Sequence, residues 1–242
     1  GSRFALHSSD TVAIEMGYDK KPIDDMLMFH LTFGKSVQDI SLNAIANLGY
    51  AEMSFPNSVF VGDTVSMIST VIGLKENSNG KSGVVYVHSI GVNQNGAVVL
   101  DFKRWVMVHK KDHANLSGVN EVPTFAKTTP ISQINIPTIK TVDTNSTGGK
   151  YFFEDYEIGE RLDHPEGITV DNSDHTLATK LYQNNAKVHF NDHMMKSTPM
   201  GQRLMYGGII ISMARAISFN GLQNAQWVCA INSGAHANPT YA

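Results

Sequence analysis

Five residues have side chains or backbone groups that could take part in catalysis or ligand binding: His189, Gly207, Gly208, Lys187 and Arg203. His189 carries an imidazole whose usual pKa, about 6.5, lets it gain or lose a proton near neutral pH, although a lone histidine before Phe190 is also typical of a packed polar residue. Gly207 and Gly208 precede apolar residues at helical spacing, so their N–H groups are expected to open a helix, where they suit an oxyanion. The same pair is equally typical of a turn that serves packing alone. Lys187 and Arg203 carry the charge that phosphate groups bind, although isolated basic residues usually face solvent.

Other polar residues carry weaker signals. Asp174 and His175 are neighbours in the chain, and adjacent residues on a helix point apart, so together they do not build a metal site. The sequence has neither an H-E-x-x-H motif nor a cysteine cluster, and we expect no metal ion. The single cysteine, Cys229, excludes an internal disulfide framework and is typical of a reducing compartment.

The overall composition excludes several classes of protein. The 242 residues are 42% hydrophobic, which is enough to bury a core. Nineteen Lys and Arg against 22 Asp and Glu give a net charge of −3, so no general basic field for nucleic acid exists. No apolar run approaches the roughly 18 residues that a membrane span needs. We therefore expect a cytoplasmic protein that binds neither nucleic acid nor membrane.

An internal repeat runs through the chain. Ile40–Asn47 and Ile217–Asn224 share the pattern I-S-[apolar]-N-x-[apolar]-x-N at an offset of 177 residues. Ala5–His7 matches Lys187–His189 in the same order, at an offset of 182. Two complete copies would need about 360 residues, so the chain corresponds to the rear of a first copy joined to the front of a second.

This duplication predicts three parts. Residues 1–111 are expected to form the rear of the first copy, and residues 151–242 the front of the second. Residues 112–150 are rich in Pro, Thr, Asn and Ser without periodicity, which is typical of a linker.

Apolar spacing predicts one long helix in each copy. Met26–Ala46 and Met205–Leu222 both carry apolar residues at helical intervals. A shorter helix is expected to contain Leu177–Tyr182, with Asp171 or Ser173 as its N-cap.

Strands are expected mainly in the first copy. Val65–Lys75 and Gly83–Val108 are rich in Val, Ile and Tyr and are interrupted by turn sequences, which predicts three antiparallel strands. Tyr151–Phe153 and Gly167–Val170 are expected to be extended and to supply the opening strand that the first copy lacks. Together these patterns predict an α+β fold in which an antiparallel sheet wraps around a helix. We expect the two halves to complete each other, within one chain or by exchange in a homo-oligomer.

Several segments resemble MaoC-like acyl-CoA dehydratases. Tyr151–Glu160 resembles the aromatic-rich opening of that family, F-x-D-[FY]-x-x-G. Asp174–Tyr182 and then Val188–Phe190 resemble its next helix and catalytic segment, and Tyr206–Gly208 resembles the start of its central helix. Three further stretches are similar to the mesaconyl-CoA hydratase type within this family: Ile72–Asn77, Leu181–Asn184 and Leu222–Asn224.

The resemblance implies a hot dog fold, in a double hot dog arrangement, and the addition or removal of water at an enoyl-CoA. The catalytic motif of the family reads approximately G-D-x-N-P-[apolar]-H, and alignment on its histidine gives His189 here, with Asn184 at the aspartate. An amide cannot accept a proton, so His189 would be the base while Asn184 orients water. Gly207 and Gly208 would hold the thioester oxyanion. Lys187 and Arg203 would meet the CoA phosphates.

The first copy departs further from this motif. The alignment gives His7 at the histidine, Ser2 at the aspartate and Phe4 at the asparagine. Both replacements remove hydration chemistry, so we expect the first half to be non-catalytic and to help shape the acyl site. Members of this type are longer than the present chain, and we expect a fragment without either outer end.

The resemblance favours a hydratase or dehydratase that acts on a branched or dicarboxylic acyl-CoA thioester. Such an enzyme would need no cofactor, since CoA belongs to the substrate, and would form a homo-oligomer. Asn184 and the missing ends favour an alternative, a catalytically weak hot dog module that binds acyl-CoA or serves oligomerisation. A thioesterase of the same fold usually has a carboxylate on its central helix, and Ile209–Leu222 contains none.

Overall fold

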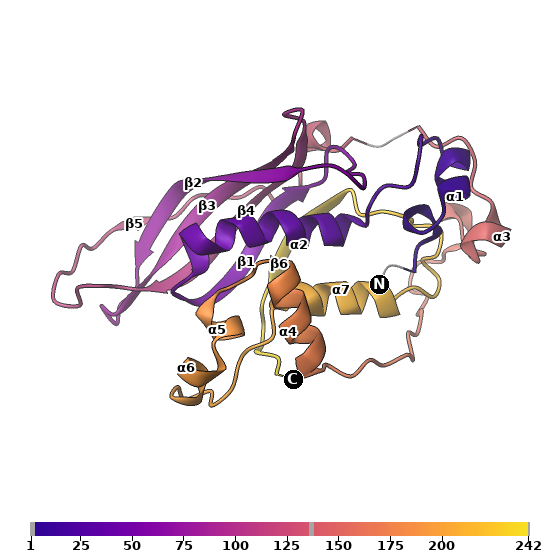
Figure 1. The fold of residues 1–242 in the computed structure, drawn as a ribbon. Coiled ribbons are helices and arrows are strands. Elements are labelled where there is room, and N and C mark those ends of the chain that lie inside the picture. Colours follow the sequence, from indigo (N-terminus) through magenta and orange to yellow (C-terminus); the bar gives the residue numbers. More distant parts are fainter. Residues whose placement is uncertain (1–2, 136–137, 242) are drawn as a thin grey trace.

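Hairpins build the central sheet of the protein. The computed structural model describes residues 3–135 and 138–241. Its strands are β1 (Ala44–Ser54), β2 (Val65–Glu76), β3 (Ser82–Asn93), β4 (Val98–His109), β5 (Asn120–Glu121) and β6 (Ala230–Ala235). Within the described ranges they form one antiparallel sheet in the order β5-β2-β3-β4-β1-β6 (Figure 1). The turns before β3 and β4 contain Gly80 and Gly96, whose positive φ angles of 65° and 77° favour glycine. The three strands predicted in the first copy are confirmed.

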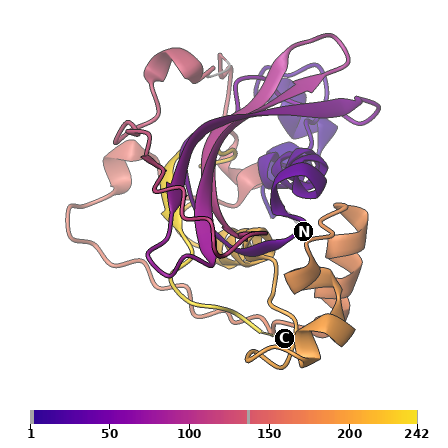
Figure 2. The ribbon, with the colours of Figure 1, turned by 90° about the vertical axis from the view of Figure 1, so that its left-hand side faces the viewer.

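The helix α2 (Asp25–Ser36) lies in the concave face of this sheet. The Asp24 carboxylate caps its start and accepts a hydrogen bond from the N–H of Met26 at 2.9 Å. Phe29 and Phe33 are buried in one core with side chains of β1 and β4. Figure 2 shows the sheet curving around α2, which is the layout that the sequence predicts.

The remaining helices of the described ranges accompany α2. They are α1 (Asp10–Glu15), α3 (Thr144–Thr147), α4 (Asn172–Leu181), α5 (Lys187–Phe190), α6 (Asp192–Lys196) and α7 (Gly207–Ile217), with 3₁₀ turns at Ala5–His7, Ile131–Gln133 and Phe153–Asp155. Of these, α7 contributes Ile209 to the same core. The predicted N-cap of α4 is confirmed, because the Asp171 carboxylate accepts the N–H of Ser173 at 2.7 Å. No helix in the described ranges is long and apolar enough to cross a membrane.

The structure supports the duplication in detail. The 3₁₀ turn at Ala5, α1 at Asp10 and α2 at Asp25 begin 182 residues before α5 at Lys187, α6 at Asp192 and α7 at Gly207. After α2 the first copy adds a five-residue π-helical turn, Val37–Ser41. Those five residues account for the smaller offset, 177, of the repeated motif that begins at Ile40 and at Ile217.

A local two-fold axis relates the two copies. β1 and β6 pair antiparallel, with Ala51 opposite Ser233. The central helices meet symmetrically, since His30 Nε2 and Ser212 Oγ are 2.8 Å apart and are repeat mates at the offset of 182. The second copy therefore continues the first copy's sheet through β6 instead of closing a sheet of its own.

Both long helices are shorter than predicted. The helical pattern of Met26–Ala46 ends at Ser36, or at Ser41 with the π-helical turn, and the chain from Ala44 onward is β1. Apolar spacing alone does not separate a helix from a buried strand, and here the ladders to β4 and β6 decide the outcome. The expected helix Met205–Leu222 is confirmed only as α7.

The opening strand expected in the second copy is wrong. Residues 151–182 are all described and contain no strand, since Phe153–Asp155 is a 3₁₀ turn and residues 167–170 are irregular. A strand needs a partner that takes its backbone hydrogen bonds, and these residues find none. Ser2, which the family alignment gives at the aspartate position of the first copy, lies outside the described residues.

The described parts of the segment predicted as a linker, residues 112–135 and 138–150, are mostly exposed on the outside of the molecule. Its short strand β5 pairs with the edge of β2, where Leu74 lies opposite Glu121. Thr129 then donates its N–H to Asn232 Oδ1 at 2.8 Å, close to β6. The boundaries at residues 111 and 150 stay predictions.

Candidate active site

His189 is held by a short helix and a neighbouring extended segment. It lies on α5, which follows a turn where Gln183 has a positive φ of 57°. Leu204 donates its N–H to the carbonyl of Val188 at 3.0 Å and accepts a bond from His189 Nδ1 at 2.9 Å. A carbonyl oxygen can only accept, so Nδ1 carries the proton and the neutral ring keeps a lone pair on Nε2. His189 is therefore oriented as a base.

The surroundings of His189 keep its ring neutral. Burial lowers its pKa to about 4, the bond to Leu204 opposes this shift, and the neighbouring His236 adds a lesser lowering. His175 lies edge-on to His189, with ring centroids 6.1 Å apart, and burial first, then His189 and Arg203, lower its pKa to about 4. Uncharged imidazoles therefore surround the base at neutral pH.

The start of α7 lies beside this base. Its N-cap, Tyr206, has its ring centroid 5.9 Å from that of His189 and donates its backbone N–H to His175 Nε2 at 3.2 Å. No side chain caps α7, and within the described residues no acceptor is recorded for the N–H groups of Gly207 and Gly208. These N–H groups are the donors that an oxyanion needs.

Both glycines are also required by packing. A Cβ added at Gly207 would overlap the ring of His236, lying 2.6 Å from its Nδ1. A Cβ added at Gly208 would lie 2.6 Å from the hydroxyl of Tyr206 and 2.9 Å from His30. The packing interpretation of the pair is thus supported, and the oxyanion role stays a prediction.

Asn184 lies in the turn between α4 and α5. It is buried, its backbone N–H donates to the carbonyl of Thr179 at 2.9 Å, and its side-chain Oδ1 has no hydrogen-bond partner within the described residues. A buried amide oxygen without a partner is uncommon and is free to bind a water or a ligand. No contact between Asn184 and His189 is recorded, so their cooperation stays a prediction.

Lys187 and Arg203, the two candidates for binding phosphate, differ in their hydrogen bonds and in their exposure. Lys187 is exposed and donates to Asn43 Oδ1 at 2.8 Å. Arg203 donates to Asn172 Oδ1 at 2.8 Å and to the hydroxyl of Thr176 at 3.1 Å. Arg203 thus braces the start of α4, while Lys187 is the more accessible of the two.

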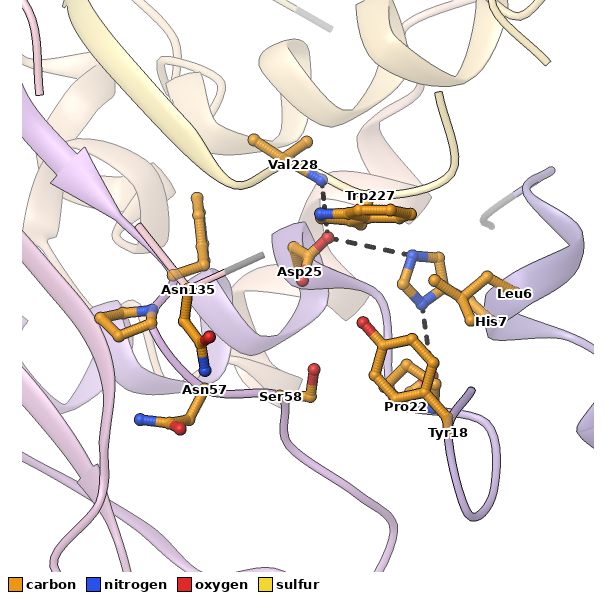
Figure 3. Close-up of a pocket in the computed structure, with 12 residues that line it drawn as sticks. Leu6, His7, Tyr18, Pro22, Asp25, Asn57, Ser58, Asn135, Trp227 and Val228 are labelled. Carbon is orange, nitrogen blue, oxygen red and sulfur yellow. Dashed lines mark hydrogen bonds and ion pairs between the residues drawn. The ribbon is translucent and has the colours of Figure 1, made fainter. Parts of the chain in front are cut away.

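The first copy contains a matching site around His7. His7 Nδ1 lies 3.3 Å from the carbonyl of Pro22, the repeat mate of the bond from His189 to Leu204. Its Nε2 lies 3.1 Å from the carbonyl of Gln226 and 3.9 Å from Asp25 Oδ2. His7 and Asp25 line a cavity of about 140 Å³. Figure 3 shows their two side chains directed toward each other.

This matching site lacks the open helix start. Asp25 stands at the position of Gly207, and Asp24 already accepts the first N–H groups of α2. Asp25 Oδ2 also accepts the N–H of Val228 at 2.8 Å, and burial raises the pKa of this carboxyl. The pair of His7 and Asp25 thus attaches a segment of the second copy to the first, and the non-catalytic role of the first half stays a prediction.

Sequence reasoning missed His236 and the part that His175 plays. The sequence singles out His175 only beside Asp174 and within the family-like segment Asp174–Tyr182, whereas in the structure its ring binds the N-cap of α7. His236 stands in a polar stretch without periodicity, so no local signal indicates its contact with Gly207. Within the described ranges, no group of three or more His, Cys, Asp or Glu residues is arranged to hold a metal ion.

Known proteins resemble this chain along its whole length. The model of the mesaconyl-CoA hydratase family matches residues 5–221. A β-methylmalyl-CoA dehydratase of Chloroflexus aurantiacus and a mesaconyl-CoA hydratase of Cereibacter sphaeroides are each 51% identical to it, over 245 and 244 residues. Each alignment covers 100% of this chain and 70% of the relative.

Solved structures agree on the fold. The crystal structure of a MaoC domain protein dehydratase from Chloroflexus aurantiacus has a TM-score of 0.95 and 50% identity, covering 100% of this chain and 70% of that one. A Mycobacterium tuberculosis protein with a double hotdog fold has a TM-score of 0.66 at 21% identity, covering 100% of this chain and 73% of that one. Fold and relatives define a MaoC-like acyl-CoA hydratase or dehydratase, a lyase with the hot dog fold. The chain belongs to the mesaconyl-CoA hydratase family.

Proposed function

We propose that this protein adds water reversibly to the double bond of a short, branched, dicarboxylic enoyl-CoA. Mesaconyl-CoA, a methylfumaryl thioester, is the substrate that the names of the relatives favour. β-Methylmalyl-CoA is its hydrate, so the two relatives are named for opposite directions of one reaction.

One observation carries the proposal: a neutral imidazole with a free Nε2 lies beside an uncapped helix start. In the hydration direction, His189 Nε2 takes a proton from water while the water oxygen bonds to the β-carbon. The π electrons move toward the thioester, whose oxygen becomes an oxyanion bound by the N–H groups of Gly207 and Gly208. The imidazolium then returns its proton to the α-carbon, which restores the neutral base.

A single histidine is sufficient for this sequence of steps. The ring that accepts the proton from water becomes the acid for the α-carbon, so the motif's missing aspartate is not needed for proton transfer. The lowered pKa of His189, about 4, makes the imidazolium a strong acid and helps the second step. Asn184 would orient the attacking water through its amide.

The rest of the molecule would serve binding. The first half would shape the acyl site, since Tyr206 stacks on Phe33 of α2 with ring centroids 5.6 Å apart. Lys187 is the better candidate for a CoA phosphate because its side chain is exposed. We also propose a homo-oligomer as the working form and no cofactor beyond the CoA of the substrate.

The experiment follows the absorbance of the enoyl thioester with a panel of CoA esters. Mesaconyl-CoA is expected to be hydrated faster than crotonyl-CoA, which lacks the second carboxylate and the methyl branch. If crotonyl-CoA alone were hydrated, the enoyl-CoA hydratase activity would stand, but the proposal of mesaconyl-CoA as the substrate would be overturned. Binding of every ester without turnover would favour the alternative, a hot dog module that only binds acyl-CoA.

A further inference from the structure

His236 is fixed beside the start of α7 by backbone hydrogen bonds. It directly follows β6, and its N–H donates to the carbonyl of Leu48 on β1 at 3.3 Å. Four residues later, the carbonyl of Thr240 accepts the N–H of Met205 at 2.9 Å. The chain between these two bonds therefore runs alongside the residues that lead into α7.

The imidazole of His236 lies directly against Gly207. A Cβ at Gly207 would be 2.6 Å from Nδ1 and 3.1 Å from Nε2, so the ring fills the space that any larger residue would need. The ring also meets Tyr50 edge-on, with centroids 5.6 Å apart. The ring is therefore held where the uncapped N–H groups of α7 begin.

The ring nitrogens of His236 differ from those of the neighbouring histidines. His175 Nε2 accepts the N–H of Tyr206, and His189 Nδ1 donates to Leu204. Within the described residues, no hydrogen bond is recorded for either ring nitrogen of His236. A polar group placed beside an open helix start without a partner is available to a ligand.

We propose that His236 is a catalytic residue that donates a ring N–H to the thioester oxygen, completing the oxyanion hole begun by Gly207 and Gly208. This inference rests on the proposed function and adds a side-chain donor to it. In the family motif quoted above, proton transfer falls to an aspartate and a histidine, and no part of that motif corresponds to His236.

The chemistry requires the ring of His236 to be neutral. Burial lowers its pKa, and the positive end of the α7 dipole disfavours a second proton. A neutral imidazole can stabilise a developing oxyanion as an electrophile. When water adds at the β-carbon, charge grows on the thioester oxygen and the bond from His236 strengthens. His236 keeps its proton throughout, so His189 alone accepts the proton from water and returns it to the α-carbon.

Two substitutions separate hydrogen-bond donation from shape. His236→Phe keeps a flat ring against Gly207 and removes the donor, whereas His236→Asn keeps a neutral N–H donor that does not titrate. We expect His236→Phe to lower kcat 10²- to 10³-fold with a small change in KM, as for other lost oxyanion donors. His236→Asn is expected to retain activity to within about tenfold. His113→Asn, at an exposed imidazole, is the matched control and should not change kcat.

A second readout does not depend on turnover. Acetoacetyl-CoA ionises to an enolate that absorbs in the near ultraviolet, and an oxyanion hole raises the fraction of enolate. Wild type and His236→Asn are expected to raise this absorbance on binding, while His236→Phe should not. His236→Leu repeats the loss if the phenylalanine variant does not fold, as judged by circular dichroism.

The outcomes are distinguishable. Full activity and a full enolate signal in His236→Phe would overturn the inference. An equal loss in His236→Asn and His236→Phe, with a shifted pH profile in the asparagine variant, would make His236 a proton carrier and also overturn it. If the wild type hydrates no enoyl-CoA, the proposed function fails, and the enolate signal alone then decides the role of His236.

Discussion

Replacing His189 by Asn separates the two roles of its imidazole. The amide N–H of asparagine can still donate to the carbonyl of Leu204, a bond that the histidine makes at 2.9 Å. The lone pair of Nε2, which would take the proton from water, has no counterpart in the amide. The substitution therefore removes the base and keeps its anchor.

The expected size of the effect follows from the lowered pKa. With a pKa of about 4, roughly one His189 ring in a thousand carries a proton at pH 7, so nearly every molecule has its base ready. Loss of an acid–base group lowers the rate 10²- to 10⁴-fold, or about 3 to 5 kcal/mol in the activation free energy. The free energy of unfolding should change by no more than about 1 kcal/mol, because the hydrogen bond to Leu204 is kept.

The assay is the pH dependence of kcat/KM for hydration of the enoyl thioester. A base with a lowered pKa is active above that pKa and is lost as pH falls through it, so the wild-type profile should decline with a midpoint near pH 4. The residual activity of His189→Asn should lack this decline.

His7→Asn is the matched control. His7 approaches the carbonyl of Pro22 as His189 approaches that of Leu204, so the same substitution is made in the same local structure. Turnover should stay nearly unchanged, since the start of α2 is already capped by Asp24. Equal losses in both variants, or an unchanged acid limb in His189→Asn, would refute the reasoning.

Four further outcomes test the packing and assembly of the protein. Gly34→Ala should lower the free energy of unfolding by about 1 to 3 kcal/mol in urea, because a Cβ there would collide with the backbone carbonyl of Tyr182, whereas Gly167→Ala, with open space around it, should not. Burial lowers the pKa of His30 to about 4, so its contribution to stability, present above pH 6.5, should fall by about 3 kcal/mol as pH drops toward 4, and His30→Asn should make the acid loss of stability smaller by that amount while the shares of His175 and His189 remain. Asp24→Ala should cost about 1 kcal/mol of stability through the lost cap of α2 without changing kcat, and a large loss of turnover would give the first half a catalytic part. Light scattering should give a mass of at least two chains, since β6 ends the order of the described sheet with one edge unpaired, and a monomer at all concentrations would contradict this.

Local patterns were sufficient where neighbouring residues decide the structure. The hairpins of β2, β3 and β4 follow from β-branched runs and glycine turns, and the cap at Asp171 follows from its place before α4. The duplication was visible because equivalent residues recur at offsets of 177 and 182. His189 and Gly207 could be singled out because an imidazole and a glycine before a helix can do chemistry, and because both lie in segments that resemble the family's motifs.

The tertiary structure decided what depends on distant partners. The residues from Ala44 onward carry a helical pattern of apolar residues but form β1. Their backbone hydrogen bonds to β4 and β6 exist only in the folded sheet, so the local pattern could not predict the strand. The protonation of His189 follows from its burial and from Leu204, which lies 15 residues away in the chain. The sequence by itself determined which groups could do chemistry. Only the fold brought His236 onto Gly207 and left one helix start open while Asp24 closed the other, because those contacts join residues with no local pattern in common.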